Sequence, residues 1–217
     1  MIPANEWWAV LQHYNETIFP AQIVLYLLAA GMVGIFIWKP GEIASRLAKG
    51  FFALAFGWIG LVFFLALGQD LPAHNAQAFL FLSLAGLFSL DLLTNTSLFR
   101  MPDDGWRKTA TLIGFGLALA YPLVGLLAGR PPSGWIIPGA FPCPTTALAL
   151  VFMATTFPPK RRWLYLLTLG LLLLWAIPFP ILIQIPKFGA YEDGIMVALG
   201  VYALVSSLLN GLPARPS

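Results

Sequence analysis

Residues 163–183 read WLYLLTLGLLLLWAIPFPILI and decide the fold class of this chain. The stretch contains no charged side chain. Its length is close to the roughly 20 residues that a helix needs to cross a bilayer core about 30 Å thick. Because hydrocarbon cannot hydrogen-bond to the peptide backbone, a helix is the form in which such a stretch is stable there. The stretch therefore predicts a transmembrane helix.

Six further apolar stretches are similar to this one, so the sequence predicts seven transmembrane helices. The expected spans are residues 18–38, 47–68, 78–99, 110–128, 135–157, 163–183 and 195–209. The predicted fold class is all-α, a polytopic seven-helix bundle that forms a single transmembrane domain over residues 1–217. The fifth span is expected to be broken, because Pro138, Pro142 and Pro144 remove backbone donors and clash with preceding carbonyl groups.

The composition is typical of a membrane protein and excludes an ordinary soluble domain. Of the 217 residues, 59% are hydrophobic and 10% are charged, whereas about 25% are charged in a typical soluble domain. The net charge of +3 comes from basic residues in loops, so we expect a lipid bilayer and no nucleic acid as partner. The single cysteine, Cys143, excludes an intramolecular disulfide and a metal cluster held by several cysteines of one chain.

The basic residues predict the orientation of the chain. Loops one, three and five, together with the tail, hold ten of the 12 lysines and arginines, and the opposite side holds Arg130 and Lys187. The ten are Lys39, Arg46, Lys49, Arg100, Arg107, Lys108, Lys160, Arg161, Arg162 and Arg215. Because basic loops remain in the cytoplasm, we expect the amino terminus outside and the carboxyl terminus inside. The first helix would serve as an uncleaved insertion signal.

A short amphipathic helix is predicted before the first span. Residues 5–14 read NEWWAVLQHY and place Trp7, Leu11 and Tyr14 on one face of a helix. We expect this helix to lie on the outer membrane interface, with Trp7 and Trp8 at the depth of the lipid headgroups.

The start of the fifth span is the first candidate site. Residues 135–144 read WIIPGAFPCP, so we expect extended or re-entrant backbone there, followed by a helix that opens at Thr145 and Thr146. Irregular backbone at membrane depth is stable where protein buries it or water fills a cavity. A substrate or ion site beside Cys143, at the positive end of that helix, is one interpretation. The other is a proline-rich loop that caps the bundle, with Cys143 as a small buried filler.

Asp91 is the second candidate site, because it lies within the third span. An aspartate near the bilayer centre costs roughly 2.5–3.5 kcal/mol on insertion scales, so it should face the bundle and be paired or protonated. Asn95 follows it at helical spacing. A second polar stripe, on the seventh span, consists of Tyr202, Ser206 and Asn210. The two stripes would line an inner gate or proton path, or they would form an interhelical hydrogen-bond clasp, and the sequence leaves both open.

Polar groups with metal-ligand chemistry occur at the expected outer rim. They are His13, Glu16, Asp70, His74, Glu192 and Asp193, besides Cys143. Histidine, carboxylate and thiolate together bind transition metals, but these residues do not have the spacing of a recognised metal motif. Whether they converge, and on which metal, stays open at this point.

Several short motifs occur together in an order that resembles a known family. They are Tyr14-Asn15, Phe19–Gln22, Tyr121–Leu123, Phe141–Thr146, Leu174–Ile177 and Glu192–Gly194. Over nearly its whole length the chain resembles domain of unknown function family 6064, a family of bacterial multi-pass membrane proteins. The resemblance implies a bacterial inner-membrane protein and carries over no activity, cofactor or catalytic residue.

The expected function is that of a small permease or channel-like protein for a small solute or ion. Prolines in the outer halves of the fifth and sixth spans, including Pro178 and Pro180, favour an outward-facing vestibule, and Asp91 would couple or gate transport. The alternative is a non-transporting protein, either an outer-face thiol or metal sensor or an accessory subunit of a membrane complex. With no nucleophile elbow and no phosphate loop, the sequence predicts no catalytic residue and no cofactor. The solute, the partner proteins and the oligomeric state do not follow from it.

Overall fold

The computed structural model describes residues 2–103, 105–156 and 159–210 of the chain. These residues form helices and connecting turns, with an isolated antiparallel bridge between Phe99 and Thr156. The elements are α1 (Ala4–Ile18), α2 (Ala21–Trp38), α3 (Glu42–Trp58), η1 (Ile59–Leu67), α4 (His74–Thr94), α5 (Gly105–Leu119), α6 (Tyr121–Leu127), η2 (Pro132–Gly134), α7 (Pro142–Ala154), α8 (Arg162–Ala176), η3 (Pro180–Gln184), α9 (Ile185–Phe188) and α10 (Asp193–Asn210). The elements η1 and η3 are π-helical continuations of α3 and α8, and η2 is a single 3₁₀ turn.

Within the described residues, four helices are long and apolar enough to cross a membrane. They are Ala21–Trp38, Glu42–Leu67, His74–Thr94 and Arg162–Phe188. The helices α5 and α6 add a fifth if they count as one span, which is bent by 57°. The apolar helices α7 and α10 are shorter. The fold is therefore all-helical, with several helices that could lie across a bilayer.

Large apolar side chains cover the outward faces of these helices. Leu27, Leu54, Leu174 and Leu208 are each more than half exposed. A soluble monomer rarely exposes extended apolar patches, whereas a lipid-facing leucine is favourable in hydrocarbon. The surface of the protein therefore suits a membrane better than water.

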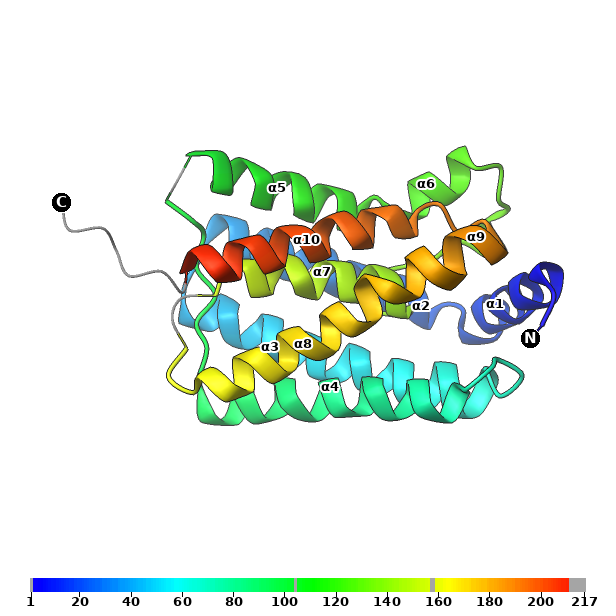
Figure 1. The fold of residues 1–217 in the computed structure, drawn as a ribbon, viewed down its shortest axis with the longest axis horizontal. Helices are drawn as coiled ribbons and strands as arrows, with labels where there is room; N and C mark the ends of the chain where they lie inside the picture. The colour runs from blue at the N-terminus through cyan, green and yellow to red at the C-terminus, as the bar shows by residue number, and fades with distance from the viewer. Residues whose placement is uncertain (1, 104, 157–158, 211–217) are drawn as a thin grey trace.

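The elements run along the long axis of the molecule in alternating directions. As Figure 1 shows, α2, the joined α3 and η1, α4, the joined α5 and α6, α7, α8 with η3 and α9, and α10 follow one another in this way. One end of the bundle is covered by α1, and we call it the α1 end. At the opposite end α2 and α4 stop and α3 begins, and we call it the Lys49 end.

The helix α7 lies in the middle of the bundle, and all 13 of its residues are buried. It packs against α3, α5, α8 and α10. The ring centroid of Phe152 lies 4.9 Å from those of Phe36 and Phe115 and 5.5 Å from that of Phe52. The first two ring pairs are tilted and the third is edge-to-face, and edge-to-face pairs stabilise a core beyond simple area burial. Side chains therefore fill the centre of the bundle.

Residues 135–141 are not helical, and the helix of the expected fifth span covers Pro142–Ala154, while residue 157 lies outside the described residues. Gly139 has a φ of +90°, which glycine adopts without strain. Its N–H donates to Oγ1 of Thr145 at 2.8 Å, and the carbonyl oxygen of Ala140 accepts from the hydroxyl of Tyr14 at 2.8 Å. Polar side chains thus satisfy backbone groups that helix hydrogen bonds leave unpaired.

The helix α1 packs on protein along the face that the sequence predicts. Its buried residues are Leu11, Tyr14, Asn15 and Ile18. Nδ2 of Asn15 donates to the carbonyl oxygens of Ser133 and Trp135 at 2.8 and 2.9 Å. Neighbouring loops therefore cover this face of α1, and their backbone carbonyls accept from the side chain of Asn15. The position of α1 at the outer membrane interface stays a prediction.

The helix α4 stops before Phe99, where the third span is expected to end. Asn95 has a left-handed φ of +45°. Oδ1 of Asp91 accepts hydrogen bonds from the backbone N–H groups of Thr96 and Ser97 at 3.0 and 2.8 Å. Because the carboxylate competes for these donors, it ends the helix and turns the chain.

Candidate functional site

A pocket of about 190 Å³ lies at the α1 end of the bundle. Parts of α1, η1, α8 and α9, the start of α4 and the residues around the start of α7 form its wall. Seven of the 18 residues that line it are aromatic, among them Phe63, Phe64, Trp175, Phe179 and Phe188. Concave sites with mostly apolar walls and a few placed polar groups are typical of small-molecule binding.

The buried polar groups of the lining residues are on Cys143, Trp175 and Gln184, and the less buried Gln77 and Lys187 also line the pocket. Nε2 of Gln184 donates to Sγ of Cys143 at 3.1 Å. Oε1 of Gln184 and the indole N–H of Trp175 are buried without a hydrogen-bond partner among the described residues, although the indole lies close to the Cys143 sulfur. Both atoms are enclosed by protein, behind the surface of the pocket.

A buried carboxylate lies behind Cys143. Asp193 is the first residue of α10 and is 0% exposed. Its Oδ1 accepts a hydrogen bond from the hydroxyl of Tyr121 at 2.8 Å, and the thiol of Cys143 is within hydrogen-bonding reach. The partial positive charge at the start of α10 favours an acidic side chain at this position.

An ion pair between Arg130 and Glu192 fixes the turn before α10. The guanidinium also donates to the carbonyl oxygen of Gly189 at 3.1 Å and lies 3.8 Å from the ring centre of Trp8. Burial lowers the pKa of Arg130, and the negative charge of Asp193 acts in the opposite direction. These contacts join α1, the loop after α6 and the start of α10 on one side of the α1 end.

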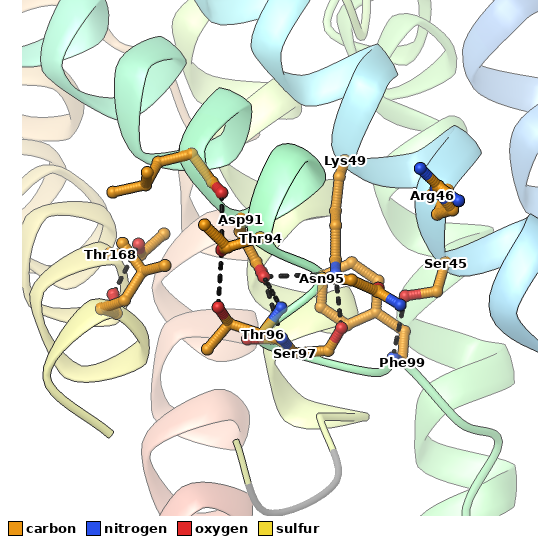
Figure 2. A network of polar contacts seen from close by, with 12 residues as sticks. Ser45, Arg46, Lys49, Asp91, Thr94, Asn95, Thr96, Ser97, Phe99 and Thr168 are labelled. Carbon is orange, nitrogen blue, oxygen red and sulfur yellow. Dashed lines mark hydrogen bonds and ion pairs between the residues drawn. The ribbon is translucent and has the colours of Figure 1, made fainter. Parts of the chain in front are cut away.

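A second polar cluster lies at the Lys49 end, and Figure 2 shows it. Nζ of Lys49 lies 3.2 Å from Oδ1 of Asp91. The ammonium group also donates to the carbonyl oxygen of Ser97 and to Oδ1 of Asn95, the latter at 3.4 Å. Lys49 is 0% exposed and Asp91 is 7% exposed. Two charges so deeply buried are stable only when they are paired and hydrogen-bonded.

The same cluster ties α4 to the loop after α7. Besides its ion pair, Asp91 holds the backbone of Thr96 and Ser97 as described above. The carbonyl oxygen of Thr96 accepts from the N–H of Lys160 at 3.0 Å. Nδ2 of Asn95 donates to Glu42 at 2.9 Å. This is the geometry of a clasp between α3, α4 and two loops.

The polar stripe expected on the seventh span has other partners. The hydroxyls of Tyr202 and Thr111 are 2.8 Å apart. Ser206 is buried, and its hydroxyl has no hydrogen-bond partner among the described residues. Asn210 ends α10, and its side chain lies outside the described part of the chain. The structure therefore directs Asp91 toward α3 and Tyr202 toward α5.

Thr145 and Thr146 are buried in the first turns of α7. Oγ1 of Thr145 donates to the carbonyl oxygen of Phe141 at 2.6 Å, in addition to accepting from Gly139. Oγ1 of Thr146 has no partner among the described residues. Of the three residues expected to form a site at the start of this helix, it is Cys143 that lines the pocket.

The residues expected at the outer rim are dispersed. His13, Glu16 and Asp70 are exposed, and His74 is half-buried with Nδ1 3.3 Å from the carbonyl oxygen of Leu71. Glu192 and Asp193 are buried in the separate contacts given above. In the part of the chain that the structure describes, no group of three or more His, Cys, Asp or Glu residues could hold a metal ion.

Four residues of these clusters are missed by the sequence analysis: Lys49, Arg130, Trp175 and Gln184. Lys49 is counted there with the basic loop residues, although it falls inside the expected span 47–68. A lysine within an apolar span indicates a buried partner. Gln184 interrupts an apolar run and gives a weaker signal of the same kind. For Arg130 and Trp175 the sequence pattern gives no such signal.

The fold and the pocket define an all-helical protein with several helices that could cross a membrane and a pocket of small-molecule size at one end. The model of the family of unknown function DUF6064 matches residues 4–215. Because the match covers nearly the whole chain, this protein belongs to DUF6064, the family that its motifs resemble. No curated protein and no solved structure matches the chain significantly.

Proposed function

We propose that the chain forms one transmembrane domain of seven spans in the bacterial inner membrane, with the α1 end outside. The alternating passes support this arrangement, with α5 and α6 as one bent span and α7 and α10 as short spans. Exposed basic residues, including Lys39, Arg46 and Lys160, lie at the Lys49 end, whereas Arg130 and Lys187 lie at the α1 end. An excess of basic residues is typical of the cytoplasmic face, so the Lys49 end is the proposed inner end.

Cysteine labelling tests this orientation. In a Cys143→Ala background, Asp70→Cys and Asp103→Cys place single thiols at exposed positions on opposite ends of the bundle. In spheroplasts, which lack the outer membrane but keep an intact inner membrane, a membrane-impermeant maleimide should label Asp70→Cys. Asp103→Cys should stay unlabelled until the inner membrane is permeabilised. The reverse pattern, or equal labelling, contradicts the proposed orientation.

The proposed function is binding of a small molecule at the outer face, in a sensor or an accessory subunit of a membrane complex. The pocket carries this proposal. It borders the start of α7, and its wall, as far as the described residues form it, includes neither Lys49 nor Asp91. A site that is open to one side and closed toward the other suits a protein that binds without transporting.

The bundle core separates the pocket from the Lys49 end. The ring of Phe52 lies 5.1 Å from that of Phe88, and Phe56 lies 5.7 Å from Phe88. A molecule that moved from the pocket toward Asp91 would have to displace these packed rings, and close packing makes such displacement costly. The Lys49–Asp91 clasp closes the far end.

The pocket as a whole, rather than the thiol, is the proposed binding site. Cys143 is 4% exposed and already accepts a hydrogen bond from Gln184. Reactive thiols lie in exposed, electropositive surroundings, and the carboxylate of Asp193 faces this sulfur instead. Cys143 therefore forms part of the wall.

A permease is the second candidate, and one observation favours it. Residues 135–141 are non-helical backbone that leads into the short helix α7 beside the pocket. Substrate sites of many secondary transporters lie at such interrupted helices. In this mechanism the structure is an outward-open state, and separation of Lys49 from Asp91 would open the inner end.

Flux measurements on purified protein in lipid vesicles separate the two candidates. We expect entry of urea, glycerol, p-cresol, sodium ions and protons at the rates of protein-free vesicles. Saturable entry of any of these into vesicles that hold the wild-type protein would replace the binding role with the permease, and its loss in folded Asp91→Asn protein would assign the gate to Asp91. The exposed variant Asp70→Asn is the matched control.

A further inference from the structure

A groove of about 660 Å³ runs along the surface of the bundle between α2 and α3. Leu28 and Leu47 line it and are about half exposed, and the buried side chains of Met32 and Phe51 lie deeper in its wall. Among the described residues that line the groove, Arg46 carries the only charge. The groove is therefore apolar along its length and has one cationic residue.

The length of the groove matches one leaflet of a bilayer. Its residues on α2 run from Leu27 to Ile35, and those on α3 run from Ile43 to Leu54. At 1.5 Å per residue these stretches cover about 12 Å and about 16 Å of the two helices. Half of a hydrocarbon core about 30 Å thick is about 15 Å. One acyl chain of a phospholipid therefore fits along the groove within a single leaflet.

Two glycines keep the groove open. Gly31 of α2 and Gly50 of α3 both line it. A Cβ added at Gly31 would meet nothing within 4 Å, and one added at Gly50 would lie 3.8 Å from the side chain of Leu92. Larger side chains at these positions would occupy the space that an acyl chain needs.

Arg46 lies at the end of the groove that is closest to the Lys49 end of the bundle. It is in the second turn of α3, and Lys39, which directly follows α2, adds a second positive charge at this end. The guanidinium of Arg46 forms an exposed ion pair with Glu42 at 4.0 Å. This distance is longer than a hydrogen bond, and exposed pairs are weak. Arg46 therefore keeps N–H donors that can bind phosphate oxygens in pairs.

We propose that this groove binds an anionic phospholipid, with one acyl chain between α2 and α3 and the headgroup phosphate on the guanidinium of Arg46. The apolar walls position the chain, and the basic end selects the headgroup, because basic residues at a membrane surface attract anionic lipids. The site is separate from the pocket at the α1 end. It rests on the proposed function in one respect, that the chain crosses a membrane.

Comparison of phosphatidylglycerol with phosphatidylcholine tests the inference, because lipids with identical acyl chains then differ only in the headgroup. The full-length protein is purified in a neutral detergent, and native mass spectrometry counts the bound lipid while each lipid is titrated. We expect phosphatidylglycerol to bind about fivefold more tightly, as one arginine near a membrane surface provides.

Arg46→Gln assigns the headgroup contact. It should lower the affinity for phosphatidylglycerol about fivefold, to that of phosphatidylcholine, while the affinity for phosphatidylcholine changes little. Arg162→Gln is the matched control, because it removes the same charge from an exposed position at the same end of the bundle, outside the groove wall. This control variant should keep the preference for phosphatidylglycerol.

Gly31→Leu assigns the acyl chain. Its side chain should fill part of the groove and weaken the binding of both lipids severalfold. Gly170→Leu is the matched control, since Gly170 is also exposed and an added Cβ there also meets nothing within 4 Å. Unfolding temperatures show whether each variant is folded, and Gly31→Leu provides the test if Arg46→Gln is not.

Equal affinities of the wild type for the two lipids, or binding of neither, would overturn the inference. A preference that Arg46→Gln keeps, or that Arg162→Gln removes to the same extent, would also overturn it. Failure of the proposed function appears in other measurements. Reversed cysteine labelling would move the lipid site to the other leaflet, and flux through vesicles would remove the binding role of the pocket at the α1 end, and both results leave the lipid site in place.

Discussion

Lys49 and Asp91 form a buried ion pair in which Nζ and Oδ1 are 3.2 Å apart and the side chains are 0% and 10% exposed. The same carboxylate oxygen accepts two backbone hydrogen bonds from the turn after α4. A gate must separate easily, whereas a pair with this many supporting bonds resists separation. The geometry therefore favours a stabilising role for Asp91 over the gating role that its position in the sequence suggests.

Asp91→Asn should lower the free energy of unfolding by about 3–5 kcal/mol, because it leaves the buried ammonium group of Lys49 without a counter-charge. The double variant Lys49→Met, Asp91→Asn should recover part of this loss, since asparagine still accepts the backbone hydrogen bonds and no charge remains buried. Denaturant unfolding of the wild type, both single variants and the double variant in detergent measures the coupling. Asp91→Asn with wild-type stability and altered flux would support the gate instead.

Asn15→Ala should destabilise the α1 end by about 1–3 kcal/mol, because the partly buried carbonyl groups of Ser133 and Trp135 both lose their donor. The measurement is thermal unfolding together with hydrogen exchange of α1. Asn5→Ala, at an exposed position on the same helix, should change neither. Unchanged protection of α1 in Asn15→Ala would show that its apolar face alone anchors the helix.

Gly139→Ala should lower stability by about 1–3 kcal/mol, because φ is +90° and the new Cβ would lie 3.1 Å from the carbonyl oxygen of Leu25. Gly116→Ala is the matched control, since its Cβ would meet nothing within 4 Å in the interior of α5. That change should be neutral or stabilising by up to about 1 kcal/mol. Unfolding temperatures in detergent should therefore shift in opposite directions, and a common direction would contradict the strained geometry at Gly139.

Arg130→Gln should expose Cys143 to thiol reagents, because Glu192 would be left buried without its cation and the turn before α10 would loosen. Cys143 is the only cysteine of the chain, so its labelling rate with an uncharged maleimide follows opening of this end directly. We expect a rate several times that of the wild type. Arg46→Gln, which breaks an exposed ion pair with Glu42 at the opposite end, should leave the rate unchanged.

Much of the fold follows from local pattern. The apolar runs locate α2, the joined α3 and η1, and the long helix that begins at Arg162, all of which are long enough to cross a bilayer. The start of α7 differs from expectation by a few residues, because Pro142 and Pro144 occupy its first turn, where a missing N–H removes no helix hydrogen bond. The end of α4 cannot be predicted from the apolar pattern, because it depends on the hydrogen bonds that the carboxylate of Asp91 accepts from the backbone N–H groups of Thr96 and Ser97.

The candidate site is less accessible to sequence reasoning. Cys143 is a candidate from the sequence, and it lines the pocket. Two further lining residues are not candidates: Trp175 lies within a segment that reads as an ordinary apolar span, and Gln184 directly follows it. The sequence predicts both Asp70 and Asp193 at the outer rim, yet Asp70 is exposed and Asp193 is fully buried.

The amino-acid sequence by itself determined that this chain is helical, apolar along its length and biased in its basic residues, because each of these properties reflects how a short stretch partitions between water and hydrocarbon. Tertiary structure alone decided that Lys49 meets Asp91, that Asn15 holds the loop before α7, and that Gln184 borders a pocket. Lys49 and Asp91 are 42 positions apart in the sequence, Asn15 and Ser133 are 118 apart, and Gln184 and Cys143 are 41 apart. No local pattern specifies them, since they depend on how whole helices pack.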